Sequence, residues 1–414
     1  MKLKLLLLFA LISVSGCSVV NTLRMKSAND DISPEWQNNA EQQIFDAVYI
    51  GEKPYIQASV NGVSLLFLID TGASFSMLFD TPKVKSIPHD KGFELTIAGW
   101  GTEQKTKGYQ TSITEMSLGN VAFREVKMAY IPISQTKYYL TKEEAIFDGV
   151  IGHDLLRHFA WVFDKRSGTI TAHRASVIDN NTAYAVPFEM SFSKPYIPAQ
   201  VAFNDAQRFD TQVIIDSGSR HYLKLNTAYI EANDVVLSTS IKAADFGLSG
   251  MVEHQRVVVD SLRIGDNVMA NVKANIIPSD DEDDWWVIGS ALMNQYVSTI
   301  DYHASLFALT PYPHAQFESR FNLSGLELRK LSGGNFIVRY IFEGFDASTK
   351  PITVGDVITQ INGVDSTDIS EEEWLRLISL PQTLSVCLAE KSCYSIALRH
   401  ITGYSTKGAS LNAD

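Results

Sequence analysis

The chain has 414 residues, of which 45% are hydrophobic and 20% are charged, a composition typical of globular proteins. This length is too great for one hydrophobic core and predicts two or three domains. The formal net charge is −12 and no basic cluster occurs, which argues against a partner that is a nucleic acid.

The chain begins with the features of an export signal. Two lysines precede the apolar stretch Leu5–Val14, which is too short to span a bilayer as a mature helix. Small residues then lead to Cys17, and this pattern resembles a bacterial lipobox, in which the signal is removed and the cysteine is lipidated. We therefore interpret residues 1–16 as a lipoprotein signal peptide and residues 17–44 as a polar tether. An ordinary secretory signal with a chance cysteine is the alternative.

The residue after Cys17 is Ser18, which by analogy with lipoproteins of Gram-negative bacteria favours the outer membrane. We expect the protein to be anchored to that membrane through Cys17 and to face the periplasm. The two remaining cysteines, Cys387 and Cys393, lie in one apparent β-hairpin. An exported protein could join them in a disulfide, or they could be two free buried thiols.

Two short triplets, Asp70-Thr71-Gly72 and Asp216-Ser217-Gly218, each follow an apolar run that is typical of a buried strand. It is unusual for an aspartate to follow such a strand directly and to lie in a turn that contains glycine. A single triplet is a weak signal, since aspartate and glycine are common in turns. Two triplets in one chain indicate a site at which a pair of carboxylates meets.

An internal repeat relates the two triplets, which are 146 residues apart (216 − 70). The same offset relates Trp100-Gly101 to Phe246-Gly247 and holds without a gap for about 60 residues. After a shorter connection, Val150-Ile151-Gly152 matches Val287-Ile288-Gly289 at an offset of 137 residues (289 − 152). The chain therefore contains a duplicated module.

The two copies span residues 45–175 and 185–312. Within each copy, short β-branched and aromatic runs alternate with Gly, Asn and Asp turns. This pattern predicts two β-rich lobes with few helices. A third region, predicted at residues 322–402, does not repeat the first two. It contains several short strands and a helix that starts at Ser370 with a capping-box sequence.

Paired carboxylates suit the hydrolysis of a peptide bond. Two carboxylates that are held close together cannot both ionise cheaply, so they share a proton. The ionised carboxylate can activate a water molecule as a general base, while the protonated one polarises the scissile carbonyl. Glycine lets the turn bring backbone amides near the carboxylates. The hydroxyls of Thr71 and Ser217 can hydrogen-bond across the interface between the lobes.

With both triplets and both Val-Ile-Gly segments, residues 45–312 resemble an aspartic protease, each lobe being similar to a bacterial retropepsin-like module and the pair to the bilobal plan of pepsin. The resemblance implies a mainly β fold of two acid-protease-type β-barrel lobes, with Asp70 and Asp216 around one water molecule and no cofactor. It places Gly152 and Gly289 beneath the catalytic loops as supporting residues. The hairpins at Trp100-Gly101 and Phe246-Gly247 are candidate flaps, or ordinary packed turns.

The two lobes differ three residues after each aspartate, where Ala73 stands in the first and Ser219 in the second. A hydroxyl that donates to the charged carboxylate favours ionisation. We therefore predict that Asp216 is the base and that Asp70 holds the shared proton. Arg220 would suppress proton sharing if it reached the two aspartates, and we expect it instead to point toward solvent or a surface carboxylate.

The third region resembles a PDZ domain, mainly through Gly355-Asp356-Val357-Ile358 and the turn at Ile361-Asn362-Gly363. A PDZ domain would bind an extended peptide by strand addition. The resemblance places the peptide-binding loop at Gly325, Leu326 and Leu328. Glu327 in the same loop would repel a terminal carboxylate if it faced inward. An internal peptide, a regulatory contact with the lobes, or no ligand at all therefore remain open.

Other chemistries have weaker support. The nine histidines are scattered without the spacing of a zinc hydrolase, so we expect no metal site. The run Asp280–Asp284 reads better as a solvated loop than as a cation site. We interpret the chain as a periplasmic aspartic endopeptidase that cleaves extended or unfolded segments of exported proteins. The alternative is a peptide-binding or scaffold protein that retains the cleft without useful turnover.

Overall fold

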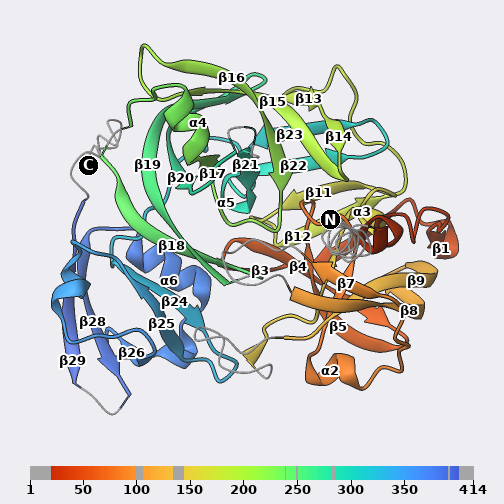
Figure 1. Cartoon of the computed structure of the whole chain (residues 1–414), viewed down its shortest axis with the longest axis horizontal. Coiled ribbons are helices and arrows are strands. Elements are labelled where there is room, and N and C mark those ends of the chain that lie inside the picture. Colours follow the sequence, from red (N-terminus) through yellow and green to blue (C-terminus); the bar gives the residue numbers. More distant parts are fainter. Residues whose placement is uncertain are drawn as a thin grey trace, which may run out of the picture.

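The computed structural model describes residues 20–97, 106–133, 144–237, 239–248, 250–281, 283, 286–389 and 392–400. Within these residues the chain forms two β-rich lobes and a separate C-terminal domain (Figure 1). The prediction of a mainly β fold with two barrel-like lobes is confirmed. The predicted signal peptide at residues 1–16 and Cys17 lie outside the described residues.

Lobe 1 is built on one mixed sheet in the order β1-β9-β6-β10-β5-β4-β8-β7, with β3 paired to β4. Its elements are β1 (Glu35–Trp36), η1 (Gln37–Asn39), β3 (Val48–Ile50), β4 (Lys53–Val60), β5 (Val63–Ile69), β6 (Met77–Phe79), α2 (Pro82–Lys85), β7 (Glu94–Ile97), β8 (Thr106–Leu118), β9 (Val121–Ile131), β10 (Gly149–Ile151) and α3 (His153–Leu156). The apolar strand β5 lies in the middle of this sheet, between β10 and β4.

Lobe 2 repeats this plan in the order β14-β15-β16-β21-β17-β20-β19-β18. Its elements are β14 (Glu189–Ser191), β15 (Lys194–Ala202), β16 (Arg208–Asp216), β17 (Leu223–Asn226), α4 (Thr227–Ala232), β18 (Ile241–Gly247), β19 (Gly250–Ile264), β20 (Asn267–Ile277), β21 (Trp286–Gly289) and α5 (Ser290–Met293). In both lobes the strand that leads to a triplet pairs in parallel with the strand that contains the Val-Ile-Gly segment.

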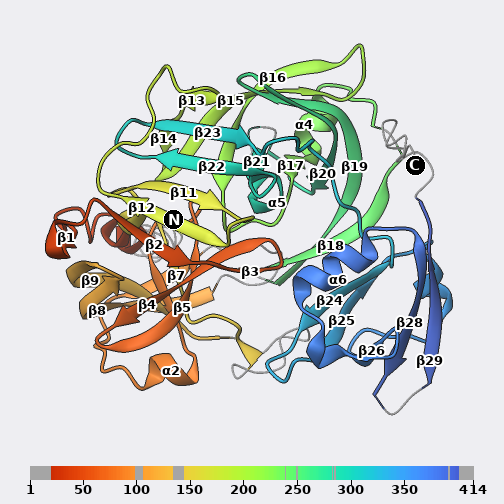
Figure 2. The ribbon, with the colours of Figure 1, turned by 180° about the vertical axis from the view of Figure 1, so that it is seen from behind.

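A further sheet joins the two lobes, and the sequence analysis does not anticipate it (Figure 2). Its order is β13-β23-β22-β11-β12-β2, from β2 (Gln42–Asp46), β11 (Ala160–Asp164), β12 (Thr169–His173), β13 (Ala185–Pro187), β22 (Tyr296–Asp301) and β23 (Leu306–Pro311). The strands β11 and β22 are equivalent in the repeat and pair antiparallel with each other. The sheet therefore holds the lobes, and the two triplets, in a fixed relation.

The predicted tether at residues 17–44 is wrong over its described part. Residues 20–26 are helical and Met25 is fully buried in lobe 1. Asn29 is buried as well, and its side-chain amide donates to Asp154 Oδ2 at 2.7 Å. The polar composition predicts a loose linker, but the buried side chains of Met25 and Asn29 fix this segment on the lobe.

The C-terminal domain contains a sheet in the order β24-β25-β26-β28-β29, with β27 paired to β26. Its elements are β24 (Leu326–Lys330), β25 (Phe336–Ile341), η3 (Asp346–Thr349), β26 (Val357–Ile361), β27 (Val364–Asp365), η4 (Ser366–Asp368), α6 (Glu371–Ile378), β28 (Gln382–Leu388) and β29 (Cys393–Leu398). The predicted helix start is confirmed, because the Ser370 side chain accepts a hydrogen bond from the Glu373 amide.

The domains have separate hydrophobic cores. One core cluster runs through both lobes, and a second consists only of side chains between Leu323 and Leu398. The C-terminal domain therefore has a core of its own. In the part of the chain that the structure describes, no helix has the length and apolar character needed to cross a membrane.

Candidate active site

The two triplets meet at the interface between the lobes. Thr71 Oγ1 accepts a hydrogen bond from the Ser217 amide at 3.0 Å and donates to the carbonyl of Ile215 at 2.7 Å. Ser217 Oγ makes the reciprocal pair, accepting from the Thr71 amide at 3.1 Å and donating to the carbonyl of Ile69 at 2.7 Å. Both hydroxyl side chains are buried. The two turns are therefore locked to each other, as the paired hydroxyls predicted.

The glycines of the triplets make room for the opposite carboxylate. A Cβ atom on Gly72 would lie 2.6 Å from the Cγ atom of Asp216, and one on Gly218 would overlap the carboxylate of Asp70. Each aspartate therefore packs against the glycine of the other turn. This arrangement brings Asp70 and Asp216 together and accounts for glycine at both positions by close approach.

The environment of Asp70 favours its protonated form. Burial raises the pKa of Asp70 to about 7, and the neighbouring Asp216 adds to the rise. Lys53 and a hydrogen bond of 2.9 Å from the Gly72 amide act in the opposite direction. Asp216 Oδ1 is buried and has no hydrogen-bond partner among the described residues. A raised pKa beside a second carboxylate is the condition for a shared proton.

Gly152 and Gly289 lie under the two turns. Each glycine precedes a short helix, and the first amide of that helix donates to the turn: His153 N to the carbonyl of Ala73 at 2.9 Å, and Ser290 N to that of Ser219 at 2.7 Å. A Cβ atom on Gly152 would lie 2.7 Å from the backbone of Phe75. These positions support the turns and do not reach the carboxylates.

The prediction that the Ser219 hydroxyl donates to the Asp216 carboxylate is wrong. The hydroxyl accepts a long hydrogen bond of 3.4 Å from the His221 amide, and the Ser219 amide donates to the Asp216 carbonyl at 3.1 Å. Among the described residues the Ser219 hydroxyl makes no hydrogen bond to the Asp216 carboxylate. The raised pKa of Asp70 agrees with the prediction that this residue holds the shared proton. The cause is the burial of Asp70 and the proximity of Asp216, rather than a hydroxyl that donates to Asp216.

Arg220 points away from the two aspartates, toward carboxylates that are buried rather than at the surface. Its Nε and Nη2 atoms donate to Asp245 Oδ1 at 3.1 and 2.7 Å, and Nη2 also donates to Glu327 Oε1. Burial alone would raise the pKa of Asp245, but Arg220 and the neighbouring His254 hold it well below its usual value. Arg220 therefore links lobe 2 to the C-terminal domain.

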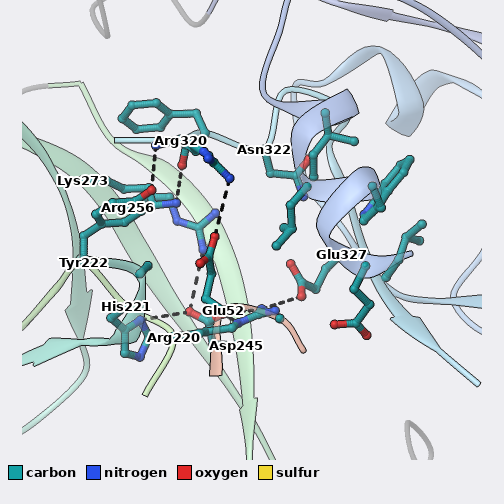
Figure 3. A pocket seen from close by; sticks show the side chains of 18 of the residues that line it. Glu52, Arg220, His221, Tyr222, Asp245, Arg256, Lys273, Arg320, Asn322 and Glu327 are labelled. Atoms are coloured by element: carbon teal, nitrogen blue, oxygen red, sulfur yellow. Dashed lines mark hydrogen bonds and ion pairs between the residues drawn. The ribbon is translucent and has the colours of Figure 1, made fainter. Parts of the chain in front are cut away.

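A cavity of about 90 Å³ lies at this junction (Figure 3). Lobe 2 contributes basic side chains to it, including Arg256 and Lys273. The C-terminal domain contributes apolar side chains from β24, β25 and α6, namely Leu328, Phe336, Trp374, Leu375 and Ile378. The groove that the sequence analysis assigned to a peptide therefore faces lobe 2 across this cavity.

The three predicted groove residues differ in their surroundings. Leu328 lines the cavity, whereas Leu326 is fully buried in the domain core. Gly325 has a φ of +73° and packs against Phe345, so it shapes the loop. Glu327 is buried and faces Arg220.

Two further predictions concern hairpins. Cys387 and Cys393 form a disulfide between directly opposed positions of β28 and β29. Of the two candidate flaps, Trp100-Gly101 lies outside the described residues. The tip of the other contacts the C-terminal domain, since the Arg339 guanidinium lies 3.6 Å above the centre of the Phe246 ring. A flap at this hairpin therefore stays a prediction.

The sequence analysis missed two lysines beside the triplets. Lys53 and Lys194 each begin the strand that pairs with a triplet-bearing strand, and both interact electrostatically with the aspartates. The available signal was the repeat itself, because Lys-Pro-Tyr-Ile occurs at residues 53–56 and again at 194–197. Among the described residues, no group of three or more His, Cys, Asp or Glu side chains is arranged to hold a metal ion.

Comparison with known proteins bears on the first lobe. Residues 56–155 match the family model described as aspartyl protease, and this segment includes the first triplet and Gly152. Lobe 1 is therefore similar to an aspartyl protease domain. The aspartic proteinase from Irpex lacteus is a similar solved structure, with a TM-score of 0.42 and 12% sequence identity over 67% of this chain and 100% of that chain. No curated protein sequence matches the chain.

Proposed function

We propose that the protein is an aspartic endopeptidase whose active site is the pair Asp70 and Asp216. The observation that carries this proposal is the reciprocal locking of the two triplets through Thr71 and Ser217, with each aspartate against the opposite glycine. The similarity of lobe 1 to an aspartyl protease domain and the repeat of its geometry in lobe 2 support the same conclusion.

The proposed reaction needs one proton on the pair. Asp216 accepts a proton from a water molecule whose oxygen attacks the carbonyl carbon, while Asp70 donates its proton to the carbonyl oxygen. The resulting tetrahedral diol then collapses: the C–N bond breaks, Asp216 gives its proton to the leaving amine, and Asp70 takes a proton from one diol hydroxyl, which leaves a carboxyl group and restores the starting state of the pair. The raised pKa of Asp70 supports its part as the proton donor in the first step.

The alternative, a peptide-binding or scaffold protein without useful turnover, rests on Arg220 and Glu327. That argument is weakened because Asp245 and Glu327 engage the guanidinium away from the aspartates. The enzyme is therefore the better-supported reading.

The test is cleavage of an unstructured peptide library by the wild type and by the variants Asp70→Asn and Asp216→Asn. We expect both substitutions to abolish cleavage, because each removes a group that must exchange a proton with the substrate or the water. The exposed Asp205 provides the matched control Asp205→Asn. Retained cleavage in either active-site variant, with folding verified by circular dichroism, would contradict the proposal.

We also propose that the enzyme is a lipoprotein anchored through Cys17 at the periplasmic face of the outer membrane, where exported proteins in unfolded form are its substrates. The Lys2–Cys17 pattern and the disulfide between Cys387 and Cys393 support an oxidising compartment. Incorporation of labelled palmitate in the wild type, and its loss in Cys17→Ser, would test the anchor.

The C-terminal domain, in the same proposal, is a PDZ-like module. The apolar groove between β24 and α6 supports this assignment. Among the alternatives for its ligand, the ion pair of Glu327 with Arg220 favours a regulatory contact with the lobes. Peptide-array binding to the full-length protein, with Leu328→Ser as the groove variant, tests for a peptide ligand.

A further inference from the structure

A two-residue turn, Gly51-Glu52, joins β3 to β4 in lobe 1. Both residues have a positive φ, +56° for Gly51 and +74° for Glu52. Glycine adopts this conformation freely, whereas it is uncommon for a residue that has a Cβ atom. A glutamate held in this strained conformation indicates that its side chain has a specific role at this position.

The turn is connected to the Asp216 side of the site through α5. The side-chain amide of Asn294 donates to the carbonyl of Glu52 and to its Oε2 atom, both at 2.8 Å. Asn294 caps the C-terminal end of α5, and Ser290 at the start of that helix donates to the Ser219 carbonyl through its amide and its hydroxyl, both at 2.7 Å. The Ser219 amide donates to the carbonyl of Asp216 at 3.1 Å. An unbroken path of contacts therefore joins Glu52 to the turn of the second triplet.

The turn is connected to the Asp70 side through β4. Glu52 directly precedes Lys53, the first residue of that strand. Strands β4 and β5 are antiparallel with Tyr55 opposite Leu68, so continuing the register places Lys53 opposite Asp70. Directly opposed residues point to the same face of a sheet. Lys53 also acts to lower the pKa of Asp70. The turn therefore fixes how Lys53 lies toward Asp70.

The carboxylate of Glu52 shares its two cations with the C-terminal domain. The Lys165 ammonium donates to Glu52 Oε2 at 2.7 Å and to Glu372 Oε2 at 2.9 Å. Arg320 Nη1 donates to Glu372 Oε1 at 3.1 Å and lies 3.9 Å from Glu52 Oε1. Glu372 belongs to α6, so the network spans two domains. The side chains of Glu52 and Lys165 are only 12% and 16% exposed, so water screens their ion pair less than one at the surface.

The turn also packs directly against α6. Gly51 and Glu52 line the cavity between lobe 2 and the C-terminal domain (Figure 3). A Cβ atom on Gly51 would lie 3.1 Å from Oε2 of Glu371, at the start of α6. A displacement of α6 would therefore act on the turn through packing as well as through charge.

We propose that Glu52 is a positioning residue of the active site, through which docking of the C-terminal domain activates the enzyme. With α6 docked, Glu52 and Glu372 share Lys165 and Arg320, and the turn holds β4 and α5 in the arrangement that the two aspartates need. With α6 displaced, the turn loses this support on its outer side. The inference rests on the proposed function, because it names the regulation of the same site.

The test compares Glu52→Gln, Glu372→Gln and the double variant in the cleavage of an unstructured peptide. We expect kcat to fall about tenfold in Glu52→Gln and about fivefold in Glu372→Gln at constant KM, because the aspartates shift while the peptide still binds. The double variant should be no slower than Glu52→Gln, since Glu372 acts through Glu52. Glu373→Gln is the matched control on α6 and should keep the kcat of wild type. The Glu373 carboxylate pairs with Arg376 of its own helix at 3.8 Å.

A second readout, the pKa of Asp70 followed by ¹³C NMR, does not require cleavage. The titratable groups that interact with Asp70 include Asp216, Lys53, Lys194 and Tyr302. In Glu52→Gln, the loss of a negative charge alone would lower the pKa of Asp70, whereas displacement of Lys53 would raise it. We expect the pKa to rise in Glu52→Gln and to stay unchanged in Glu373→Gln.

Costs that multiply to about fiftyfold in the double variant, a change in KM with normal kcat, or a lowered pKa of Asp70 would each overturn the assignment. Circular dichroism verifies folding, and Lys165→Gln, which removes one shared cation, replaces Glu52→Gln with the same expectations if that variant is unfolded. A wild type that does not cleave, with a raised pKa of Asp70 in Glu52→Gln, would contradict the proposed enzyme and support the positioning role.

Discussion

Asp70 and Asp216 come from equivalent positions of a repeat, yet their surroundings differ. Burial and a like-charged neighbour raise the pKa of Asp70, while Lys53 and the Gly72 amide limit the rise. Ser219, the residue whose hydroxyl suggested an asymmetric pair, makes its observed contact with a backbone amide. The raised pKa of Asp70 therefore comes from burial and the neighbouring carboxylate, which the identity of the residue three positions away does not determine.

The pH dependence of activity should reflect the proton on Asp70. Because Asp70 must be protonated to donate, we expect kcat/KM to fall as pH rises through about 7, with a slope of about tenfold per pH unit. Lys53→Met should move this limb to higher pH, since Lys53 lowers the pKa of Asp70. The measurement is a pH–rate profile with a neutral peptide substrate. A limb that lies near pH 4, or that moves downward in Lys53→Met, would contradict the account.

The hydroxyl of Thr71, in lobe 1, forms hydrogen bonds with two backbone groups of lobe 2. Thr71→Val keeps the shape of the side chain but leaves the buried amide of Ser217 and carbonyl of Ile215 without their partner. We expect a loss of about 1–3 kcal/mol in the free energy of unfolding, with a loss of activity. Thr71→Ser keeps the hydroxyl and should cost less. Chemical denaturation measures both, and equal values for the two variants would count against the hydrogen bonds.

At the scale of elements, the repeat predicted most of the machinery of the site. Strands β5 and β16 with their triplets, and strands β10 and β21 beside them, follow from apolar runs that recur at a constant offset. The sheet shared by the lobes did not follow, because its strands come from distant parts of the chain and are short. Pairing over such sequence separations has no local signal.

Substitution of a glycine beneath the triplets tests whether the helices α3 and α5 support the turns. Gly152→Ala would place a Cβ atom 2.7 Å from the Phe75 backbone, so we expect the turn to shift and kcat to fall at least tenfold. Stability should fall by about 1–3 kcal/mol. The matched control is Gly333→Ala, where no atom lies within 4 Å of the added carbon. Normal kcat in Gly152→Ala would contradict the supporting role.

At the scale of the whole molecule, the C-terminal domain is docked through polar contacts. Besides the ion pair of Arg220 and Glu327, the Tyr340 hydroxyl donates to Glu253 at 2.9 Å, and Lys165 pairs with Glu372. The sequence indicated that Arg220 and Glu327 were unusual for their motifs. It could not show that each is the partner of the other, because they are 107 residues apart and belong to different domains.

Breaking this ion pair should loosen the docking. Glu327→Gln leaves Arg220 with one of its two buried carboxylates, and we expect a loss of about 3 kcal/mol in the free energy of unfolding. Combining Glu327→Leu with Arg220→Met should cost less than the sum of the single changes. Glu343→Gln, at an exposed position of the same domain, is the control. Additive costs in the double variant would argue against a direct pair.

The central claim is that Asp70 and Asp216 form one site that shares a proton. The most direct measurement is a pH titration of the aspartate carboxyl carbons by ¹³C NMR in the wild type and in Asp216→Asn. We predict that Asp70 titrates near pH 7 in the wild type and at lower pH in the variant, because removing Asp216 removes a like charge. A carboxyl of Asp70 that titrates near pH 4 in both proteins would contradict the claim.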